Sequence, residues 1–335
     1  MIIVLPKENA ATAINKLTAI FGGHRDVFTH RNRISIGGIT PDQLPSDIRQ
    51  MATQIITDVP KAIQSSRLLH PENEIIKLPH TTIGDGSLAL MAGPCAVESE
   101  AHVKKMAAIA KQGGATVLRG GAFKPRTSPY SFQGLGEEGL KFLREAADEQ
   151  GMDVITEVMD DEHVPMIAKY TDVFQIGSRN MQNFSLLKAV GKTNIPVALK
   201  RGMSATIDDW LNAAEYIAAE GNHQIMLVER GIRTFDNTHT RNTFDAGAIA
   251  ALRQLTPFPI IADPSHATGD RQLVSPVGLA GVAAGADGLI VEIHDHPEKA
   301  LSDGPQALTP TMFKQLMKKS QAMHDLMNDF EEVNA

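Results

Sequence analysis

The sequence has 335 residues, of which 42% are hydrophobic and 21% are charged, a composition typical of a folded globular protein rather than a disordered chain. Its formal net charge of −7 argues against a nucleic acid or an anionic membrane surface as partner, because both favour an excess of Lys and Arg. Cys95 is the one cysteine, and the sequence has neither a signal-peptide core nor a run of about 18 apolar residues, so we expect a cytoplasmic protein without disulfides.

Residues 1–70 are predicted to form a small α/β domain. Their strands and helices follow approximately the order β-α-β-β-α-β of the ferredoxin-like fold. The expected elements are a strand at Ile2–Leu5, a helix at Ala10–Phe21, a strand at Arg33–Ile39, a helix from Thr40 to about Thr57 and a last strand at Val59–Ser66. Residues 71–82 read as a linker, and residues 83–335 as a second, larger domain.

The larger domain repeats one pattern, in which a short apolar strand is followed by an amphipathic helix. The eight predicted strands are Leu88–Gly93, Ala115–Gly120, Asp153–Val158, Val173–Ser178, Pro196–Gly202, Gln224–Gly231, Pro259–His266 and Gly288–His294. Eight such units in about 250 residues predict a (β/α)8 TIM barrel. A doubly wound open sheet is the alternative, but the sequence lacks the GxGxxG and GxxxxGK[ST] loops of the nucleotide-binding members of that class.

Chemistry in such barrels lies at the carboxyl ends of the strands, and many of these ends carry a cation. The cationic residues are Arg119, Lys124, Arg126, Arg179, Lys200 and Arg230. Gathered at one mouth they would repel one another, so they predict bound anions, such as two phosphates and a carboxylate. The alternative is that each cation pairs with a nearby acid or lies on a solvated loop.

A second set of residues at the strand ends has the donors of a transition-metal site: Cys95, His266, Glu292 and Asp303. Their irregular spacing makes a weak linear motif, and a lone cysteine after an apolar strand is often buried filler. His294 and His296 are rival imidazoles. A metal beside an anion-binding mouth favours Lewis-acid activation of a carbonyl group.

The segment "KPRTSPYSF", Lys124–Phe132, is predicted to be a phosphate-binding loop. Two prolines stiffen it, while Arg126, Thr127 and Ser128 offer a guanidinium and two hydroxyls to one phosphate and Lys124 reaches inward.

The motifs "GPC", "LRGGAFKPRTSPYSFQGLG", "QIGSRNMQN", "LKRG", "DPSH" and "ALSDGPQ" resemble the 3-deoxy-D-arabino-heptulosonate 7-phosphate (DAHP) synthase family, the first enzymes of the shikimate pathway. The resemblance covers residues from about Ile83 onward. It implies condensation of phosphoenolpyruvate with erythrose 4-phosphate and water, and one divalent ion per subunit (Mn²⁺, Fe²⁺, Zn²⁺ or Co²⁺).

The resemblance also implies residue roles. Cys95, His266, Glu292 and Asp303 carry over as metal ligands, and Arg126 and Thr127, with Ser128 beside them, as ligands of the aldose phosphate. The residues for phosphoenolpyruvate and its surroundings are Arg119, Lys124, Arg179, Lys200, Arg230, Glu157 and Asp263. Lys124, Cys95 and His266 are expected to take part in catalysis, with the proton donor left open between Lys124 and a water on the metal.

Other readings stay open. The sister family makes 3-deoxy-8-phosphooctulonate (KDO8P) from arabinose 5-phosphate, but it resembles "KANRSS" where this chain has "KPRTS". A class II aldolase would not need so many cations, and a non-catalytic regulatory barrel would lack a metal ligand. Residues 1–70 serve either packing or, as an ACT-like domain, feedback inhibition by tyrosine or phenylalanine. The family resemblance implies a homotetramer.

Overall fold

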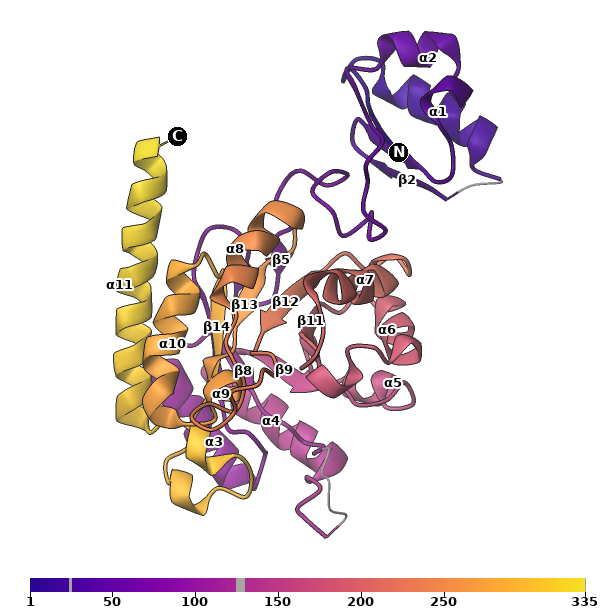
Figure 1. Ribbon diagram of the computed structural model, residues 1–335. Coiled ribbons are helices and arrows are strands. Elements are labelled where there is room, and N and C mark those ends of the chain that lie inside the picture. The colour runs from indigo at the N-terminus through magenta and orange to yellow at the C-terminus, as the bar shows by residue number, and fades with distance from the viewer. Residues whose placement is uncertain (24–25, 125–129, 335) are drawn as a thin grey trace. The chain divides into compact units, whose positions relative to one another are not determined.

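The computed structural model describes residues 1–23, 26–124 and 130–334, and the side chains up to residue 329. The chain divides into two compact units (Figure 1). One unit comprises Met1–Glu72 with Gln254–Pro257, and the other comprises Asn73–Arg253 with Phe258–Ala335. Among the helices of the described residues, none combines the length and the apolar character that crossing a membrane requires.

The N-terminal unit contains a four-stranded antiparallel sheet in the order β2-β3-β1-β4. Its elements are β1 (Ile2–Val4), α1 (Ala10–Phe21), β2 (Val27–His30), β3 (Arg33–Ile36), the 3-10 turn η1 (Pro41–Gln43), α2 (Ser46–Met51) and β4 (Gln54–Ile56). Helix α1 turns Ala10, Ala13 and Leu17 into the core, at the three- and four-residue spacing of one helix face. This topology confirms the ferredoxin-like prediction.

Two predicted boundaries in this unit are wrong. The second helix ends at Met51 rather than near Thr57, and the last strand is β4 rather than Val59–Ser66. Ile56 pairs with Ile2, so the short run of β-branched residues in β4 completes the sheet. Pro60 has no N–H to give to a strand ladder, which explains why the later segment does not pair.

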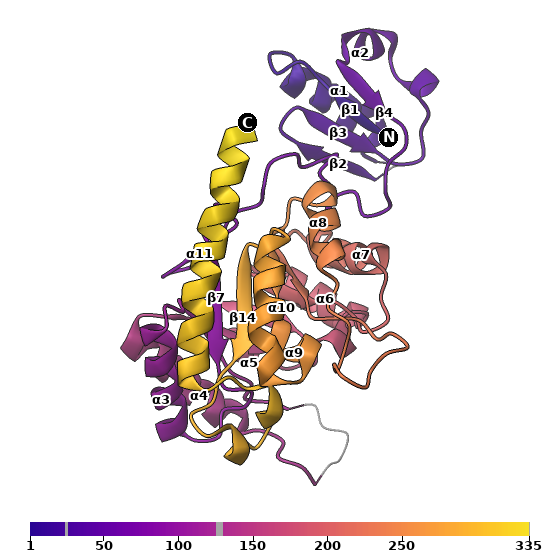
Figure 2. The same ribbon diagram turned by 60° about the vertical axis from the view of Figure 1, so that its left-hand side comes forward.

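The larger unit is a closed barrel of eight parallel strands, as predicted (Figure 2). The strands are β7 (Ala89–Gly93), β8 (Val117–Arg119), β9 (Asp153–Glu157), β10 (Val173–Ile176), β11 (Val197–Lys200), β12 (Ile225–Glu229), β13 (Ile260–Ala262) and β14 (Gly288–Glu292). The ring closes between β14 and β7, where Glu292 pairs in register with Gly93. Apolar side chains such as Met91, Ile155 and Met226 fill its interior, so the barrel is a packed core rather than a channel.

Residues 71–82, expected to be a linker, contain structure of their own. The strands β5 (Ile76–Lys77) and β6 (Thr82–Ile83) form an antiparallel hairpin. Ile76 and Ile83 are fully buried in the same cluster as the barrel interior. The hairpin therefore belongs to the core of the barrel unit.

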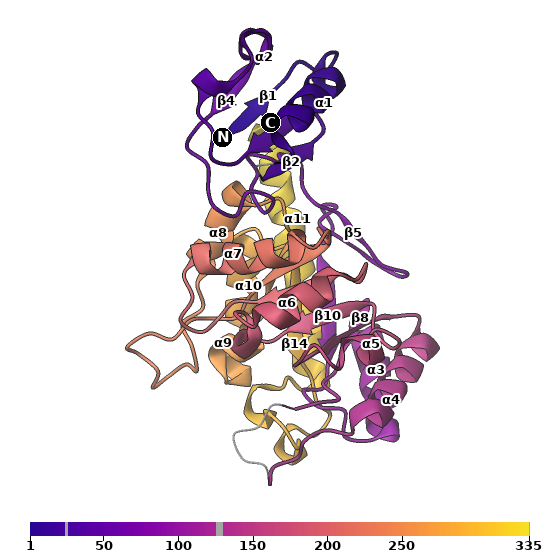
Figure 3. The same cartoon turned by 90° about the vertical axis from the view of Figure 1, so that its right-hand side faces the viewer.

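Helices surround the barrel on its outer face (Figures 1 and 3). They are α3 (Glu100–Gln112), α4 (Gly136–Gln150), α5 (Val164–Ile167), α6 (Phe184–Gly191), α7 (Ile207–Ala218), α8 (Ala246–Leu255), α9 (Pro264–Thr268), α10 (Arg271–Ala283) and α11 (Pro310–Asn334). The long helix α11 runs beside α10 in both Figures 1 and 2. On α7, the indole N–H of the fully buried Trp210 donates to the carbonyl oxygen of Leu199 over 3.1 Å, which ties this helix to the end of β11.

Candidate active site at the carboxyl ends of the barrel strands

A cavity opens at the carboxyl ends of the barrel strands, and its walls are strongly cationic. The cations that line it are Arg119, Lys124, Arg179, Lys200, Arg230 and Arg241. The strand ends set this arrangement, since Arg119 is the last residue of β8 and Lys200 the last of β11. Five of the six were predicted from the sequence. The sixth predicted cation, Arg126, lies outside the described residues together with Thr127 and Ser128.

Four candidate metal ligands meet at one side of this cavity. One ligand atom each from Cys95, Glu292 and Asp303 lies within 4.8 Å of the other two. The Nε2 atom of His266 lies 3.4 Å from Glu292 Oε1, so the imidazole adjoins the same cluster. A thiol, an imidazole and two carboxylates fit a divalent transition metal, and the chemistry of the donors therefore agrees with the ligand set predicted from the sequence.

Glu292 is ionised in spite of complete burial. Burial raises its pKa, but the charges of His266 and Arg119 outweigh this and hold the pKa at about 2. Arg119 Nη1 lies 3.0 Å from Glu292 Oε1, and Gln306 Nε2 donates to Oε2 over 2.8 Å. Both carboxylate oxygens are thus fixed in position.

The thiol of Cys95 is buried, and burial followed by the charge of Glu292 raises its pKa to about 11. Lys124 acts in the opposite direction, with its Nζ atom 3.1 Å from the sulfur and 2.9 Å from the carbonyl oxygen of Cys95. In the metal-free chain the sulfur is therefore protonated at neutral pH, and a bound ion would displace this proton.

Asp263 is not among the residues that line the cavity. It contacts Lys200 and His266, which do line it. Its Oδ2 atom accepts from Lys200 Nζ over 2.6 Å and lies 2.8 Å from His266 Nδ1. Burial alone would raise the pKa of Asp263, but His266 and Lys200 hold the pKa well below its usual range. With Nδ1 held by Asp263, His266 presents Nε2 to the Cys95–Glu292–Asp303 cluster.

The sequence analysis placed Asp263 and His266 at the end of a strand that runs to His266. The structure ends β13 at Ala262, and Pro264 starts helix α9, with Asp263 as its N-cap residue. Pro264 suits the first position of a helix, where no N–H is needed. The turn brings Asp263 and His266 to the same side, three residues apart.

Two further guanidinium groups of the cavity lining act on that of Arg230. Burial lowers the pKa of Arg230, and the positive charges of Arg241 and Arg179 add to this effect. Arg241 Nη1 also lies 3.6 Å from Oδ1 of Asp303, which is one of the candidate metal ligands. A bound phosphate or carboxylate would relieve this repulsion, and planar guanidinium groups suit such anions.

Sequence reasoning missed Arg241. The segment between β12 and α8 has no helix or strand to set a register, so the pattern of strand ends could not place Arg241 at the cavity. Arg201, which follows Lys200 at the end of β11, pairs with Glu229 at 3.0 Å and with Asp245 at 2.9 Å.

The two rival histidines lie elsewhere. The imidazole of His294 is buried close to His102 and Glu98, and His296 is mostly exposed beside Glu298. Glu157, at the end of β9, lines the cavity next to Gly177.

Comparison with known proteins gives the family. The model of the DAHP synthetase I family matches residues 62–329. The chain belongs to this family. A phospho-2-dehydro-3-deoxyheptonate aldolase of Thermotoga maritima is 51% identical over 262 residues, which cover 78% of this chain and 77% of that protein. A 2-dehydro-3-deoxyphosphooctonate aldolase of Geobacter sulfurreducens is similar at a lower level, 31% identical over 258 residues, which cover 72% of this chain and 93% of that protein.

The fold of this DAHP synthetase I member also matches solved structures. The crystal structure of the phospho-2-dehydro-3-deoxyheptonate aldolase (DAHP synthase) of Thermotoga maritima is 42% identical, with a TM-score of 0.79 over 97% of each chain. A truncated form of 3-deoxy-D-arabino-heptulosonate 7-phosphate synthase from the same organism gives a TM-score of 0.74 at 46% identity, over 78% of this chain and 96% of that one. The longer match thus includes the N-terminal unit and confirms the predicted fold class.

Proposed function

We propose that this chain is a DAHP synthase, which joins phosphoenolpyruvate to erythrose 4-phosphate and water and releases inorganic phosphate. The observation that carries this function is the meeting of the six cations with Cys95, His266, Glu292 and Asp303 around one cavity. The 51% identity to a phospho-2-dehydro-3-deoxyheptonate aldolase supports the heptulosonate product, since the octulosonate relative of Geobacter sulfurreducens is only 31% identical.

The cationic residues that line the cavity are the proposed binding site for phosphoenolpyruvate. Arg179, Arg230 and Arg241 lie close enough to repel one another, and phosphoenolpyruvate carries both a phosphate and a carboxylate. Arg119 and Lys200 complete the wall, each fixed by a buried carboxylate at 3.0 Å and 2.6 Å. These paired groups are preorganised, so little reorganisation is needed when negative charge develops in the cavity.

The bond-forming step joins carbon 3 of phosphoenolpyruvate to the aldehyde carbon of erythrose 4-phosphate. A divalent ion held by Cys95, His266, Glu292 and Asp303 would supply Lewis-acid polarisation of the aldehyde. Lys124, whose ammonium group lies 3.1 Å from Cys95 Sγ and faces the cavity, donates a proton to the oxygen of the former aldehyde.

Carbon 2 of phosphoenolpyruvate then takes up water, and its C–O bond to phosphate breaks. We assign the positioning of this water to Glu157, a cavity carboxylate at the end of β9. Arg126, Thr127 and Ser128 are proposed to bind the phosphate of erythrose 4-phosphate, as the family motif implies. The homotetramer and the cytoplasmic location stay predictions.

The test is consumption of phosphoenolpyruvate by chelator-treated protein, with and without added Mn²⁺. Erythrose 4-phosphate and arabinose 5-phosphate are offered separately. We expect turnover with the four-carbon sugar that disappears on chelation and returns with the ion. Preference for arabinose 5-phosphate would assign the chain to KDO8P synthesis, and no turnover with either sugar would contradict an enzymatic role.

We further propose that the ferredoxin-like unit binds tyrosine or phenylalanine and inhibits the barrel. Its four-stranded antiparallel sheet with two helices has the ACT-like topology on which this rests. A chain beginning at Asn73 keeps the β5–β6 hairpin and should retain activity while losing inhibition by either amino acid. Inhibition that survives the deletion would contradict this role.

A further inference from the structure

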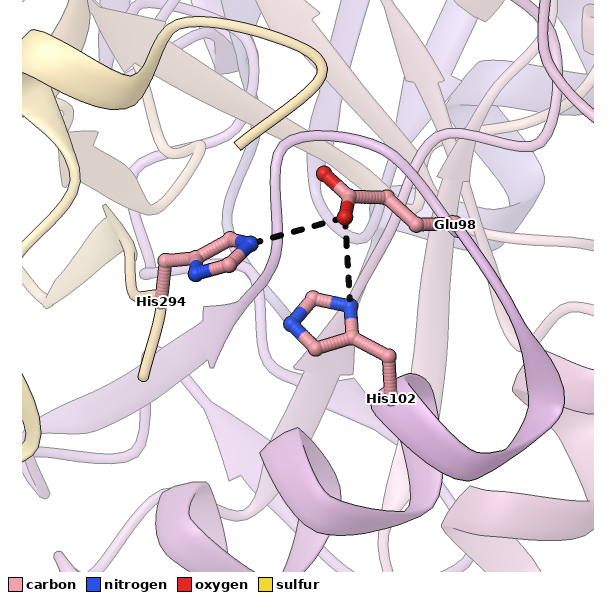
Figure 4. Close-up of side chains that lie close together, drawn as sticks. All are labelled: Glu98, His102 and His294. Carbon is pink, nitrogen blue, oxygen red and sulfur yellow. Dashed lines mark ion pairs between the residues drawn. The ribbon is translucent and has the colours of Figure 1, made fainter. Parts of the chain in front are cut away.

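A second group of metal-ligand side chains lies outside the wall of the cavity. Glu98 precedes helix α3, His102 lies in its first turn, and His294 follows β14 (Figure 4). Glu98 Oε2 lies 3.6 Å from His294 Nε2 and 3.9 Å from His102 Nδ1. The three residues are absent from the described lining of the cavity, so they form a separate cluster.

The cluster is oriented by its surroundings. The second ring nitrogen of each histidine faces the same carboxylate oxygen, Asp295 Oδ1, at 3.2 Å from His294 and 3.3 Å from His102. Lys105 holds the other oxygen of Asp295 over 2.6 Å. Glu98 Oε1 accepts the backbone N–H of Leu301 over 2.8 Å, which leaves Oε2 directed at the two rings.

Three of the four ring nitrogens are buried without a hydrogen bond. Within the described part of the chain, His102 Nδ1, His102 Nε2 and His294 Nε2 have no partner of hydrogen-bonding geometry. His294 is only 5% exposed. Leaving a buried polar atom unpaired is unfavourable, and such atoms call for a ligand.

We propose that Glu98, His102 and His294 bind a second divalent ion of the zinc or cobalt class. Ligand atoms about 2.1 Å from a tetrahedral ion lie about 3.4 Å apart, close to the two separations measured from Glu98 Oε2. Two imidazoles and one carboxylate are a common donor set for these ions, and water fills the remaining position. Asp295 takes the place of the outer carboxylate that commonly orients metal-bound histidines.

Binding requires one rearrangement of a proton. The backbone N–H of His296 lies 2.9 Å from His294 Nδ1, which accepts from it. With Nε2 on the ion, Nδ1 would carry the ring proton and donate it to Asp295 Oδ1, 3.2 Å away, and the N–H of His296 would lose its present acceptor.

An ion bound at this second site would restrain the loops that carry the candidate ligands of the first metal site. Glu98 lies three residues after Cys95, and His294 lies two after Glu292. Leu301, bonded to Glu98, precedes Asp303 by two residues. The proposal goes beyond the assigned reaction, because it concerns ion binding alone and holds whichever sugar the enzyme accepts.

Ion counting on the full-length, chelator-treated chain tests the proposal. We expect two Co²⁺ per chain after equilibrium dialysis, measured by atomic emission. His102→Asn and Glu98→Gln should each reduce the count to one, with affinity at the lost site falling at least about 10- to 100-fold. Glu98→Gln keeps an oxygen for the N–H of Leu301 and serves if His102→Asn folds poorly. His296→Asn, on the same loop, is the matched control and should retain both ions.

Cys95→Ser isolates the second site. This variant should lose the thiolate-to-cobalt charge-transfer absorption and still bind one ion with high affinity. A single ion per wild-type chain that accounts for the whole charge-transfer signal would overturn the proposal. Two ions in both His102→Asn and Glu98→Gln would overturn it as well. Neither result bears on turnover, so failure here is distinguishable from failure of the assigned reaction.

Discussion

The ammonium group of Lys124 lies 3.1 Å from the sulfur of Cys95 and 2.9 Å from the carbonyl oxygen of the same residue. One side chain thus contacts a candidate metal ligand from the side that faces the substrate cavity. The cation opposes the effects of burial and of Glu292, which together raise the pKa of the Cys95 thiol to about 11. We therefore propose two separable roles for Lys124, one in proton transfer and one in easing loss of the thiol proton.

Lys124→Met should separate these roles. We expect kcat to fall by about 10²–10⁴-fold, the usual contribution of a proton donor. Metal affinity should fall less and become more pH-dependent, because the thiol loses its neighbouring cation. Turnover is measured at saturating substrate and metal, and ion binding by titration at pH 7 and pH 9. A kcat close to that of the unmodified chain would remove Lys124 from catalysis.

Gly177→Ala tests Glu157 without changing the carboxylate itself. A Cβ atom at Gly177 would lie 2.1 Å from Glu157 Oε1, so the flexible end of Glu157 has to move. We expect kcat/KM to fall about ten- to a hundredfold, equivalent to about 1–3 kcal/mol for a displaced polar group. The thermal midpoint should change little, since no backbone atom is crowded.

Two comparisons make this result interpretable. Glu157→Gln should cause a loss of similar size, and Gly247→Ala, whose added carbon would meet a side chain only at 3.4 Å, should leave activity unchanged. Full activity of Gly177→Ala would mean that the position of Glu157 is unimportant for the reaction.

Asp303 combines a proposed ligand role with an unusual backbone conformation. Its φ of 51° lies in the left-handed region, which Asn and Asp tolerate better than other side chains. Asp303→Asn and Asp303→Ala should both weaken metal binding, by more than the roughly 10- to 100-fold cost of losing an outer-shell partner. Asp303→Ala should in addition lower the free energy of unfolding by about 1–2 kcal/mol. Denaturant unfolding of the metal-free variants distinguishes the two effects, and equal stability would contradict the backbone argument.

Asp153 gives a pH dependence that is unrelated to the active site. Burial, opposed by the backbone N–H of His80, raises the pKa of this fully buried carboxyl group at the start of β9 to about 6. The unfolded chain ionises near pH 4, so the folded chain binds the proton more tightly and loses stability as pH rises from about 4 to 6. The cost at pH 7 is at most about 3 kcal/mol.

Asp153→Asn should remove this cost. We expect its thermal midpoint to match or exceed that of the unmodified chain at pH 7.5 and to lose this advantage by pH 4.5. Asp172→Asn is the control with the opposite sign at pH 7.5, because Asp172 pairs with Arg144 over 2.6 Å. A lower midpoint for Asp153→Asn at pH 7.5 would contradict the argument.

Arg241→Gln tests the cation that the sequence analysis did not identify. Arg241 adds to the positive field on Arg230 and lies 3.6 Å from Asp303. We expect the KM for phosphoenolpyruvate to rise about tenfold, the effect of about 1.4 kcal/mol, and inhibition by inorganic phosphate to weaken in parallel. An unchanged KM would exclude Arg241 from the anion site.

The barrel was predictable because its signal is local. Each parallel strand is buried on both faces and reads as a continuous apolar run, and the polar residue that follows marks its carboxyl end. The N-terminal unit was harder, because the apolar character of Val59–Ser66 resembles that of β4. Sheet pairing between Ile2 and Ile56 decides between the two segments, and this is a long-range contact.

Site residues at the ends of barrel strands could be predicted from the sequence. Site residues in long loops could not. Lys200 and Glu292 end strands, so their positions at the carboxyl end of the barrel followed from the fold. The pairing of Arg201 with Glu229 and Asp245, like the approach of Arg241, depends on how a chain without regular structure folds back. Composition alone carries no information on such a path.

The hydrogen bond from Trp210 to Leu199 has a practical consequence. Trp210 is the single tryptophan of the sequence, and its partner immediately precedes Lys200 in the cationic wall. The guanidinium of Arg201 lies 5.8 Å from the centre of the indole ring. The tryptophan fluorescence of this protein therefore comes from one residue, joined to the cavity by a strand end. We expect binding of phosphoenolpyruvate to change this emission, so that a titration needs neither a label nor turnover.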